Sequence, residues 1–243
     1  MENIIVRKQK WEMFGDSTGD RQMIHRDLSR VDPEILKKYN ITKEFAPGMY
    51  IASFIQGWPC IQSVKSIRFE PTRIYDGDVV KVVALPNIVG KGIDYSFSKG
   101  EDIVCKVNGV KFGDPDGKEV KIMNDVCYEH LTDIDPAKVS YFLGSLGYSI
   151  EDGRPNMFLA SKFAPALLAY GESKGVGDGV YATQSFNSHL SYEHGPLSIL
   201  VGDERIHKTE EGELKRYKVQ AVQNNKVVVS GRSSIGVLEK IAA

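Results

Sequence analysis

Residues 45–56 form the stretch that most constrains the fold, because they read as the start of a helix that is apolar on nearly every side. A helix without a polar face must be enclosed by other parts of the chain. Pro47 suits the first helical turn, where its missing N–H is harmless, and Gly48 beside it lets another group approach the backbone closely. We therefore expect a buried helix whose first turn presents free N–H donors.

Strand-like runs follow this helix, and a breaker then divides the chain. The runs lie at residues 61–70, 78–85, 93–98 and 102–110 and are rich in residue types typical of strands. The segment Gly-Asp-Pro-Asp-Gly at 113–117 is the strongest breaker in the sequence. We therefore expect an N-terminal domain at residues 1–115 and a C-terminal domain at 116–243.

Upstream of the apolar helix the sequence predicts three smaller elements. They are a strand with a mixed face at residues 3–13, a turn-rich loop at 14–20, and a short helix that ends near residue 38. Asp32 and Pro33 suit the N-cap and the first position of that helix.

The second half of the chain repeats the order of the first. Phe163 opens a second Phe-Ala-Pro segment 118 positions after Phe45, and Gly195 follows Gly77 by the same offset. Strand candidates follow at 180–192, 197–203, 214–222 and 226–238. The alternative is chance similarity between two amphipathic segments. A buried helix followed by consecutive antiparallel strands is satisfied when the sheet curls around the helix. The pattern thus predicts an α+β protein with a tandem, or double, hot dog fold, each sheet wrapped around a central helix.

Composition excludes several classes of function. The 243 residues include 31 Lys and Arg against 32 Asp and Glu, so no broad basic field exists to attract nucleic acid or an anionic membrane. Cys60, Cys105 and Cys127 are scattered, and no histidine pair has zinc-ligand company, so we expect no metal and a reduced, cytoplasmic protein. No run approaches the roughly 20 apolar residues that a membrane span needs.

Asp20 and His25 are the most reactive-looking pair in the sequence. Alone, their spacing is a weak signal, since an Asp that ends a turn and a His that bonds locally would explain it. The surrounding run, Ser-Thr-Gly at 17–19, Asp20, His25 and Asp27, is followed by a helix and then by Gly-Met at 48–49. This arrangement resembles the signature of the MaoC-like, R-specific enoyl-CoA hydratase family. Gln22 and Met23 depart from the usual Asn and Pro of that signature.

The resemblance implies a hydratase site. Hydration of a 2-enoyl thioester needs a base for water, an acid for the α-carbon and donors to the thioester oxygen. By the resemblance, Asp20 and His25 are the acid/base pair that orients the water, and the N–H of Gly48 is the oxyanion donor. Coenzyme A or an acyl carrier is part of the substrate, and no separate cofactor is expected. The residues expected to bind substrate are Gln22, Met49, Phe163 and Tyr170.

One active site per chain is expected, and two other functions stay open. At the offset of 118, Lys138 and Leu143 replace the acid/base pair. A hot dog thioesterase is an alternative, although Glu44 is the single carboxylate near the apolar helix. A noncatalytic acyl-binding protein is the other. The partner is an acyl thioester. The tandem fold already satisfies the pairing that single hot dog domains meet by dimerising, and a homodimer of the whole chain is a further expectation.

Overall fold

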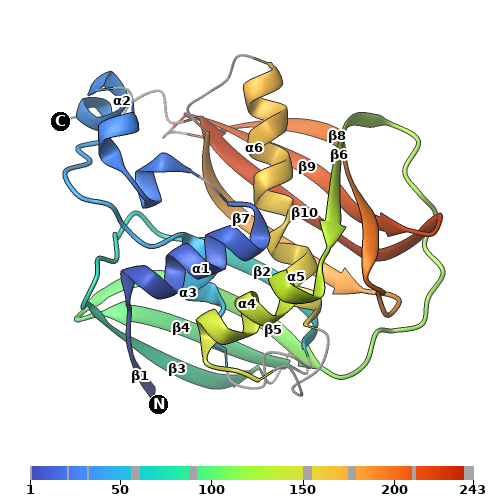
Figure 1. Cartoon of the computed structure of the whole chain (residues 1–243), viewed down its shortest axis with the longest axis horizontal. Coiled ribbons are helices and arrows are strands. Elements are labelled where there is room, and N and C mark those ends of the chain that lie inside the picture. The colour runs from blue at the N-terminus through green and yellow to red at the C-terminus, as the bar shows by residue number, and fades with distance from the viewer. Residues whose placement is uncertain are drawn as a thin grey trace.

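The computed structural model describes residues 2–20, 22–31, 33–55, 61–87, 92–149, 155–174, 179–209 and 212–237 (Figure 1). The first half contains β1 (Glu2–Ile5), α1 (Lys8–Thr18), two 3₁₀ turns, η1 (Met23–His25) and η2 (Leu28–Arg30), α2 (Pro33–Lys38), α3 (Gly48–Ala52), β2 (Ile61–Phe69), β3 (Val79–Asn87), β4 (Gly92–Lys99) and β5 (Asp102–Phe112). The second half contains β6 (Val126–Ile134), α4 (Pro136–Leu146), α5 (Asn156–Ser161), α6 (Phe163–Ser173), β7 (Gly179–Ser188), β8 (Gly195–Thr209), β9 (Gly212–Gln223) and β10 (Lys226–Val237).

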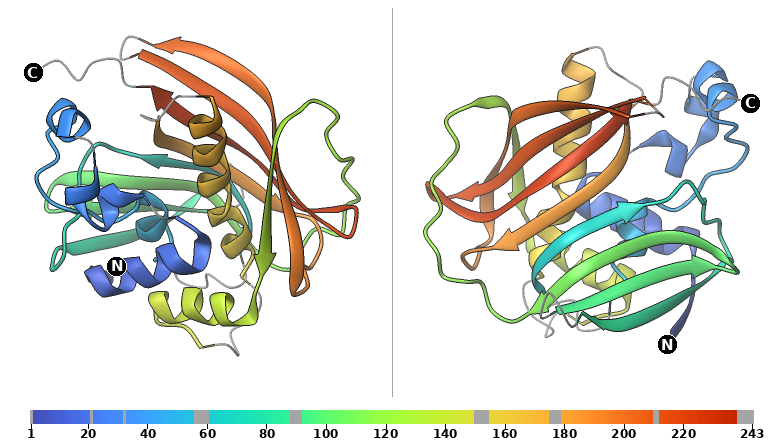
Figure 2. Two further views of the ribbon diagram at one scale, coloured as in Figure 1. Left: turned by 45° about the horizontal axis from the view of Figure 1, so that its top comes forward. Right: turned by 180° about the vertical axis from the view of Figure 1, so that it is seen from behind.

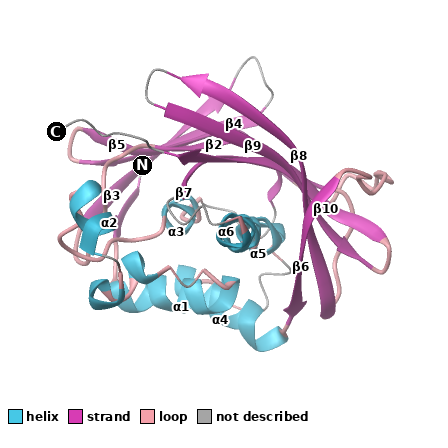
Figure 3. Ribbon diagram, turned by 90° about the horizontal axis from the view of Figure 1, so that it is seen from above, coloured by secondary structure: helices cyan, strands magenta, loops and turns pink. Residues whose placement is uncertain are grey.

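The strands form one antiparallel sheet to which both halves contribute. Its order is β1-β3-β4-β5-β2-β7-β10-β9-β8-β6, so the halves meet where β2 pairs with β7. Figure 3 shows the sheet bent around α3, α5 and α6, with α1 and α4 as an outer layer over these helices. The core lies between these layers and includes Ile51, Ile67, Phe158 and Val219. The fold therefore encloses the central helices, as their apolar sequences require.

The N-terminal region differs from its prediction. The predicted strand at 3–13 is wrong beyond Ile5, and the predicted loop at 14–20 is wrong up to Thr18, because α1 occupies residues 8–18. Trp11, Phe14 and Thr18 are buried on one side of this helix at helical spacing. Gly19 ends it in the left-handed conformation with φ 92°. Asp20 therefore follows a helix end and not a long turn.

The first central helix is also shorter than predicted. Residues 45–47 are not helical, Pro47 is the N-cap, and α3 covers five residues. Residues 53–55 are described and are not helical, so the predicted helix over 45–56 is wrong beyond Ala52. Residues 56 and 57, Asp32 and Cys60 lie outside the described residues. The short helix predicted to end near residue 38 is confirmed as α2.

The internal repeat is real, but one constant offset does not describe it. Pro47 and Pro155 are both N-caps of short helices, and Asn156 follows Gly48 by 108 positions. Glycines 19 and 147 are both left-handed C-caps, of α1 and α4, and lie 128 positions apart. The predicted offset of 118 holds where the sheet begins, since β2 starts at residue 61 and β7 at residue 179 and glycines 77 and 195 both have positive φ, but the starts of β5 and β10, residues 102 and 226, are 124 apart. Insertions before the sheet therefore shift the register.

This shift changes which residues stand opposite the predicted acid/base pair. Lys138 and Leu143 lie within α4, whose counterpart is α1, so they are not the equivalents of Asp20 and His25. The counterpart loop begins after Gly147, and residues 150–154 of it lie outside the described part. The sequence has no histidine between His130 and His189, so the inference of one Asp/His pair does not depend on the offset.

The chain passes from the first half to the second through residues 113–125, which we call the linker. Its placement agrees with the breaker at 113–117, while the boundary at 115/116 stays a prediction. Among the helices of the described residues, none is long and apolar enough to cross a membrane.

Candidate active site

His25 lies in a buried position at the end of η1, held from two sides. The indole N–H of Trp11 donates to the His25 carbonyl at 2.9 Å. The His25 Nδ1 lies 2.7 Å from the carbonyl oxygen of Phe45, and the two rings meet edge to face with centroids 4.9 Å apart. Only 8% of His25 is exposed. The ring is therefore fixed between α1 and the segment that leads into α3.

These contacts decide which nitrogen of His25 carries its proton. A backbone carbonyl can only accept a hydrogen bond, so Nδ1 carries the hydrogen and Nε2 keeps a free lone pair. Burial lowers the pKa of His25, and the nearby Asp20 carboxylate opposes this shift. Burial dominates, so His25 is a neutral imidazole with Nε2 available as a base.

Asp20 lies in a half-buried loop tied to α1. Its side chain accepts from the backbone N–H of Gln22 at 3.4 Å, and its carbonyl accepts from Arg26 at 3.3 Å. Arg26 also pairs with Asp16 at 2.8 Å. Asp20 acts on the charge of His25, yet among the described residues the two side chains form no direct ion pair. The Asp20 and His25 side chains are thus near each other without a direct ion pair between them.

Gly15 shapes this loop and was missed by the sequence analysis. A Cβ at position 15 would lie 2.6 Å from the Asp20 carbonyl oxygen and 2.7 Å from Arg26 Nη2. Real Cβ atoms do not approach backbone so closely, so glycine lets the loop fold back on α1. Nothing in the sequence around Gly15 signals this contact, because it joins the helix to a loop through space.

Gly48 opens α3, three residues after the Phe45 that contacts His25, and the structure shows which group requires glycine there. The prediction was that glycine lets another group approach the backbone closely. In the structure, a Cβ at position 48 would lie 2.6 Å from the ring of Phe69. Close packing against β2 therefore explains the glycine. The N–H groups of the first turn of α3 have no acceptor within the helix, so Gly48, three residues after Phe45 in the sequence, keeps an N–H that can donate.

The remaining predicted residues lie in two parts of the structure, Gln22 and Met49 in the first half and Phe163 and Tyr170 in the second. Gln22 is half-buried beside Asp20, and its carbonyl accepts from the His25 N–H at 3.1 Å. Met49 is buried in the core within α3. Phe163 and Tyr170 belong to α6 in the second half, where Phe163 is fully buried and Tyr170 donates to Glu204 at 3.4 Å. Asp20, Gln22 and His25 are joined by hydrogen bonds within one loop, and the Phe45 carbonyl links His25 to the segment that leads into Gly48, whereas Phe163 and Tyr170 lie in α6 of the second half.

One contact joins the loop of Asp20 and His25 to α6 of the second half. A Cβ at Gly19 would lie 3.9 Å from the ring of Pro165, in the first turn of α6. The Asp20 loop therefore lies against the long central helix of the second half, so α6 forms one wall beside the candidate site.

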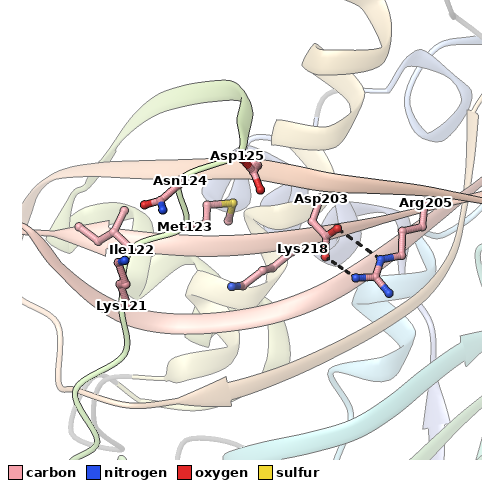
Figure 4. A pocket seen from close by; sticks show the side chains of 8 residues that line it. All are labelled: Lys121, Ile122, Met123, Asn124, Asp125, Asp203, Arg205 and Lys218. Carbon is pink, nitrogen blue, oxygen red and sulfur yellow. Dashed lines mark hydrogen bonds and ion pairs between the residues drawn. The ribbon is translucent and has the colours of Figure 1, made fainter.

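A surface pocket of about 410 Å³ lies elsewhere, on the face of the sheet opposite the helices (Figure 4). Tyr217, Val219 and Ala221 of β9 are buried in the core, so Lys218, which alternates with them along the strand, faces the opposite side of the sheet. The pocket is lined by Lys121, Ile122, Met123, Asn124, Asp125, Asp203, Arg205 and Lys218. It contains none of the predicted site residues. Within the described residues, no group of three or more His, Cys, Asp or Glu could hold a metal ion.

Comparison with known protein families and with curated proteins finds no match to the sequence. Solved structures do match. A MaoC-like dehydratase superposes with a TM-score of 0.60 at 12% identity, over 97% of this chain and 96% of that chain. A MaoC-like dehydratase from Phytophthora capsici gives 0.55 at 11% identity, over 99% and 95%. A conserved hypothetical protein from Mycobacterium tuberculosis, described as having a double hot dog fold, gives 0.57 at 9% identity, over 97% and 93%.

The chain has the double hot dog fold. The predicted fold is thereby confirmed, and the named neighbours include MaoC-like dehydratases. At such low identities the likeness concerns the fold, so the activity must be argued from the site.

Proposed function

We propose that this protein is a hydro-lyase of acyl thioesters that reversibly hydrates a trans-2-enoyl thioester to the 3-hydroxyacyl thioester. The observation that carries the proposal is the buried His25. Its Nδ1 donates to the Phe45 carbonyl, so the lone pair is on Nε2, and the Asp20 carboxylate is nearby. A neutral imidazole with one free nitrogen is the form that a general base needs.

The chemistry divides between three groups of the first half. His25 Nε2 takes a proton from water while the water oxygen bonds to the β-carbon of the substrate. Asp20 accepts a hydrogen bond from the second hydrogen of that water, which stays on the new hydroxyl group, and so orients the water. This role suits two side chains that are near each other without a direct ion pair. Charge then moves to the thioester oxygen, where the N–H of Gly48 donates. The acid formed in the pair returns the proton to the α-carbon.

The roles proposed for the substrate-binding residues rest on their positions in the structure and on its similarity to other double hot dog folds. We expect Gln22 and Met49 to contact the thioester end of the substrate, and Phe163 and Tyr170 to contact its acyl chain. The adjacency of Gly19 and Pro165 supports a substrate that runs from the Asp20 loop along α6. Coenzyme A or an acyl carrier enters as part of the substrate. A homodimer and a cytoplasmic location are further proposals.

A thioesterase is less well supported by the positions of the carboxylates. Glu44, the candidate nucleophile or base for hydrolysis, has a side chain 31% exposed and pairs with Lys8 at 3.9 Å. It therefore faces the surface of α1. A noncatalytic acyl-binding role predicts that ligand binding survives changes at His25.

The test follows the absorbance of the conjugated thioester with crotonyl-CoA and longer enoyl-CoAs. Asp20→Asn and His25→Gln should each lower the rate by at least ~10²-fold if the pair does acid/base work. His194→Gln is the matched control, because His194 is exposed in the second half. Absence of turnover with every enoyl thioester, or unchanged rates in both site variants, would refute the hydratase. Release of free thiol would instead indicate hydrolysis.

A further inference from the structure

Three side chains from distant parts of the sequence form a hydrogen-bonded row on the helix-free face of the second half. His189, just after β7, lies between Ser230 of β10 and Asp116 of the linker. Its Nε2 is 2.8 Å from Ser230 Oγ, and its Nδ1 is 3.1 Å from Asp116 Oδ1. The right-hand view of Figure 2 turns this face of the sheet toward the viewer.

The backbone fixes the row from both ends. Val229 is fully buried in the core, so Ser230 next to it faces the opposite side of the sheet. The linker is bound to the end of β7, because the N–H of Asp116 donates to the Ser188 carbonyl at 3.0 Å and that of Gly117 donates to the His189 carbonyl at 2.9 Å. The carboxylate is thus brought to the imidazole by backbone pairing.

The charges and protons of the row have one consistent arrangement. Partial burial opposes ionisation of Asp116, but hydrogen bonds from the Lys118 N–H, from Asn187 and from His189 lower its pKa to about 2. A carboxylate only accepts, so His189 Nδ1 must carry the hydrogen. Asn187 already donates to Asp116 Oδ2 at 2.9 Å, which makes its 3.3 Å approach to Nδ1 a contact between two donors. His189 Nε2 is left to accept the Ser230 hydroxyl hydrogen.

We propose that Ser230, with His189 as its base and Asp116 as the positioning residue, is a second reactive site that accepts acyl groups from small activated esters. Ser230 Oγ bonds to the ester carbonyl carbon as its proton passes to His189 Nε2. The imidazolium then gives this proton to the leaving alcohol, and the acyl group stays on Ser230. Water, deprotonated by His189, releases the acid and restores the serine. Serine, histidine and aspartate in this order of contact are the arrangement that activates a serine nucleophile on unrelated folds.

Accessibility and backbone chemistry define the kind of substrate. His189 is 5% exposed while Ser230 is half-buried, so the base is shielded and the nucleophile can be reached. Strand β10 pairs on both sides, with β7 and β9, and this uses the backbone N–H groups that would otherwise stabilise an oxyanion. The site should therefore react with esters that have good leaving groups and release the acid slowly.

The experiment uses the whole protein with p-nitrophenyl acetate and a fluorophosphonate probe, and locates the modified residue by peptide mass spectrometry. We expect a burst of p-nitrophenol and labelling at Ser230. Ser230→Ala should abolish the labelling, and His189→Gln should slow it by at least ~10²-fold. Ser185→Ala is the matched control, since Ser185 lies on the neighbouring strand and bonds to the backbone of Arg232. Equal labelling in Ser230→Ala and wild type would overturn the proposal.

A cysteine in place of the serine separates activation from structural hydrogen bonding. In Ser230→Cys, His189 should raise the thiolate fraction, so iodoacetamide should alkylate Cys at this position at least ~10-fold faster than in Ser185→Cys. Adding Asp116→Asn should slow alkylation at 230, whereas mere loosening of the linker would speed it. Equal rates in the two cysteine variants contradict the proposal. The site is independent of the hydratase, so Asp20→Asn and His25→Gln should leave the ester reaction unchanged.

Discussion

Replacing Gly15 with alanine should disturb the candidate site through one added methyl group. Gly15 lies in α1, and its added Cβ would lie 2.6 Å from the Asp20 carbonyl oxygen, so roughly 0.8 Å more room is needed to reach an ordinary 3.4 Å contact. Arg26, the other close neighbour, can swing away because it is a flexible side chain. The backbone at Asp20 cannot, so the loop that carries the carboxylate must move.

The expected magnitude combines two opposing effects. An alanine in a helix interior is more favourable than glycine by about 0.5–1 kcal/mol, while overpacking costs about 1–3 kcal/mol. The net loss in the free energy of unfolding should be about 0–2.5 kcal/mol, or up to about 10 °C in melting temperature. A misplacement near 1 Å can reduce catalysis ~10²-fold. We therefore expect enoyl-CoA hydration to fall about 10-fold or more.

Gly144 provides the matched control. It lies within α4, the counterpart of α1, and its added Cβ would meet only the end of Met13, at 4.0 Å. Gly144→Ala should therefore keep full activity and raise the free energy of unfolding by about 0.5–1 kcal/mol. Hydration rates and melting curves of the two variants are compared side by side. If Gly15→Ala matches Gly144→Ala in both, Gly15 does not hold the Asp20 loop in place.

Three further predictions concern buried groups. Because burial lowers the pKa of His25 below 6.5, hydration should fall on the acid side of pH 6.5, and stability contributed by the neutral ring should be lost as pH drops through the same range; melting curves of wild type and His25→Gln should converge there. Gly48→Ala should lower the free energy of unfolding by about 1–3 kcal/mol through contact with Phe69, and Phe69→Leu should restore part of it in denaturant titrations. Burial lowers the pKa of Lys162 to about 8, so its charging opposes folding as pH falls from its unfolded value of 10.5 toward 8; Lys162→Met should raise the melting temperature more at pH 7 than at pH 10.5.

The sheet could be predicted from sequence because its signals are local. Alternation and breakers mark the strands from β2 to β5 and from β7 to β10, whereas β6 was not predicted, and Gly77 and Gly195 both have positive φ. α1 was missed because its sequence is mostly polar and its burial rests on Trp11 and Phe14. Phe14 packs against Phe142 of α4 with centroids 5.4 Å apart. That partner is supplied by the other half of the chain, so local pattern could not reveal the helix.

The candidate residues could be selected from the sequence, but their contacts could not. Asp20 and His25 stand close in sequence, and their adjacency in space follows from the short loop between them. The tautomer of His25 depends on the Phe45 carbonyl, which no residue type encodes. The role of Gly48 as a donor stays a prediction, and the close contact with Phe69 that requires glycine there could not be predicted, because Phe69 lies on another element.

The unequal lengths of the two halves explain why only one of them carries the Asp/His pair. Between α1 and α3 the chain runs from residue 19 to 47, whereas between α4 and α5 it runs only from 147 to 155. The longer connection supplies η1 with His25 and also the extended segment whose Phe45 carbonyl orients the ring. The second half extends its central helix instead, through α6, and Pro165 of that extension lies against the Asp20 loop. The first half thus supplies the loop that carries Asp20 and His25, and the second half supplies α6, which packs against that loop where Pro165 approaches Gly19.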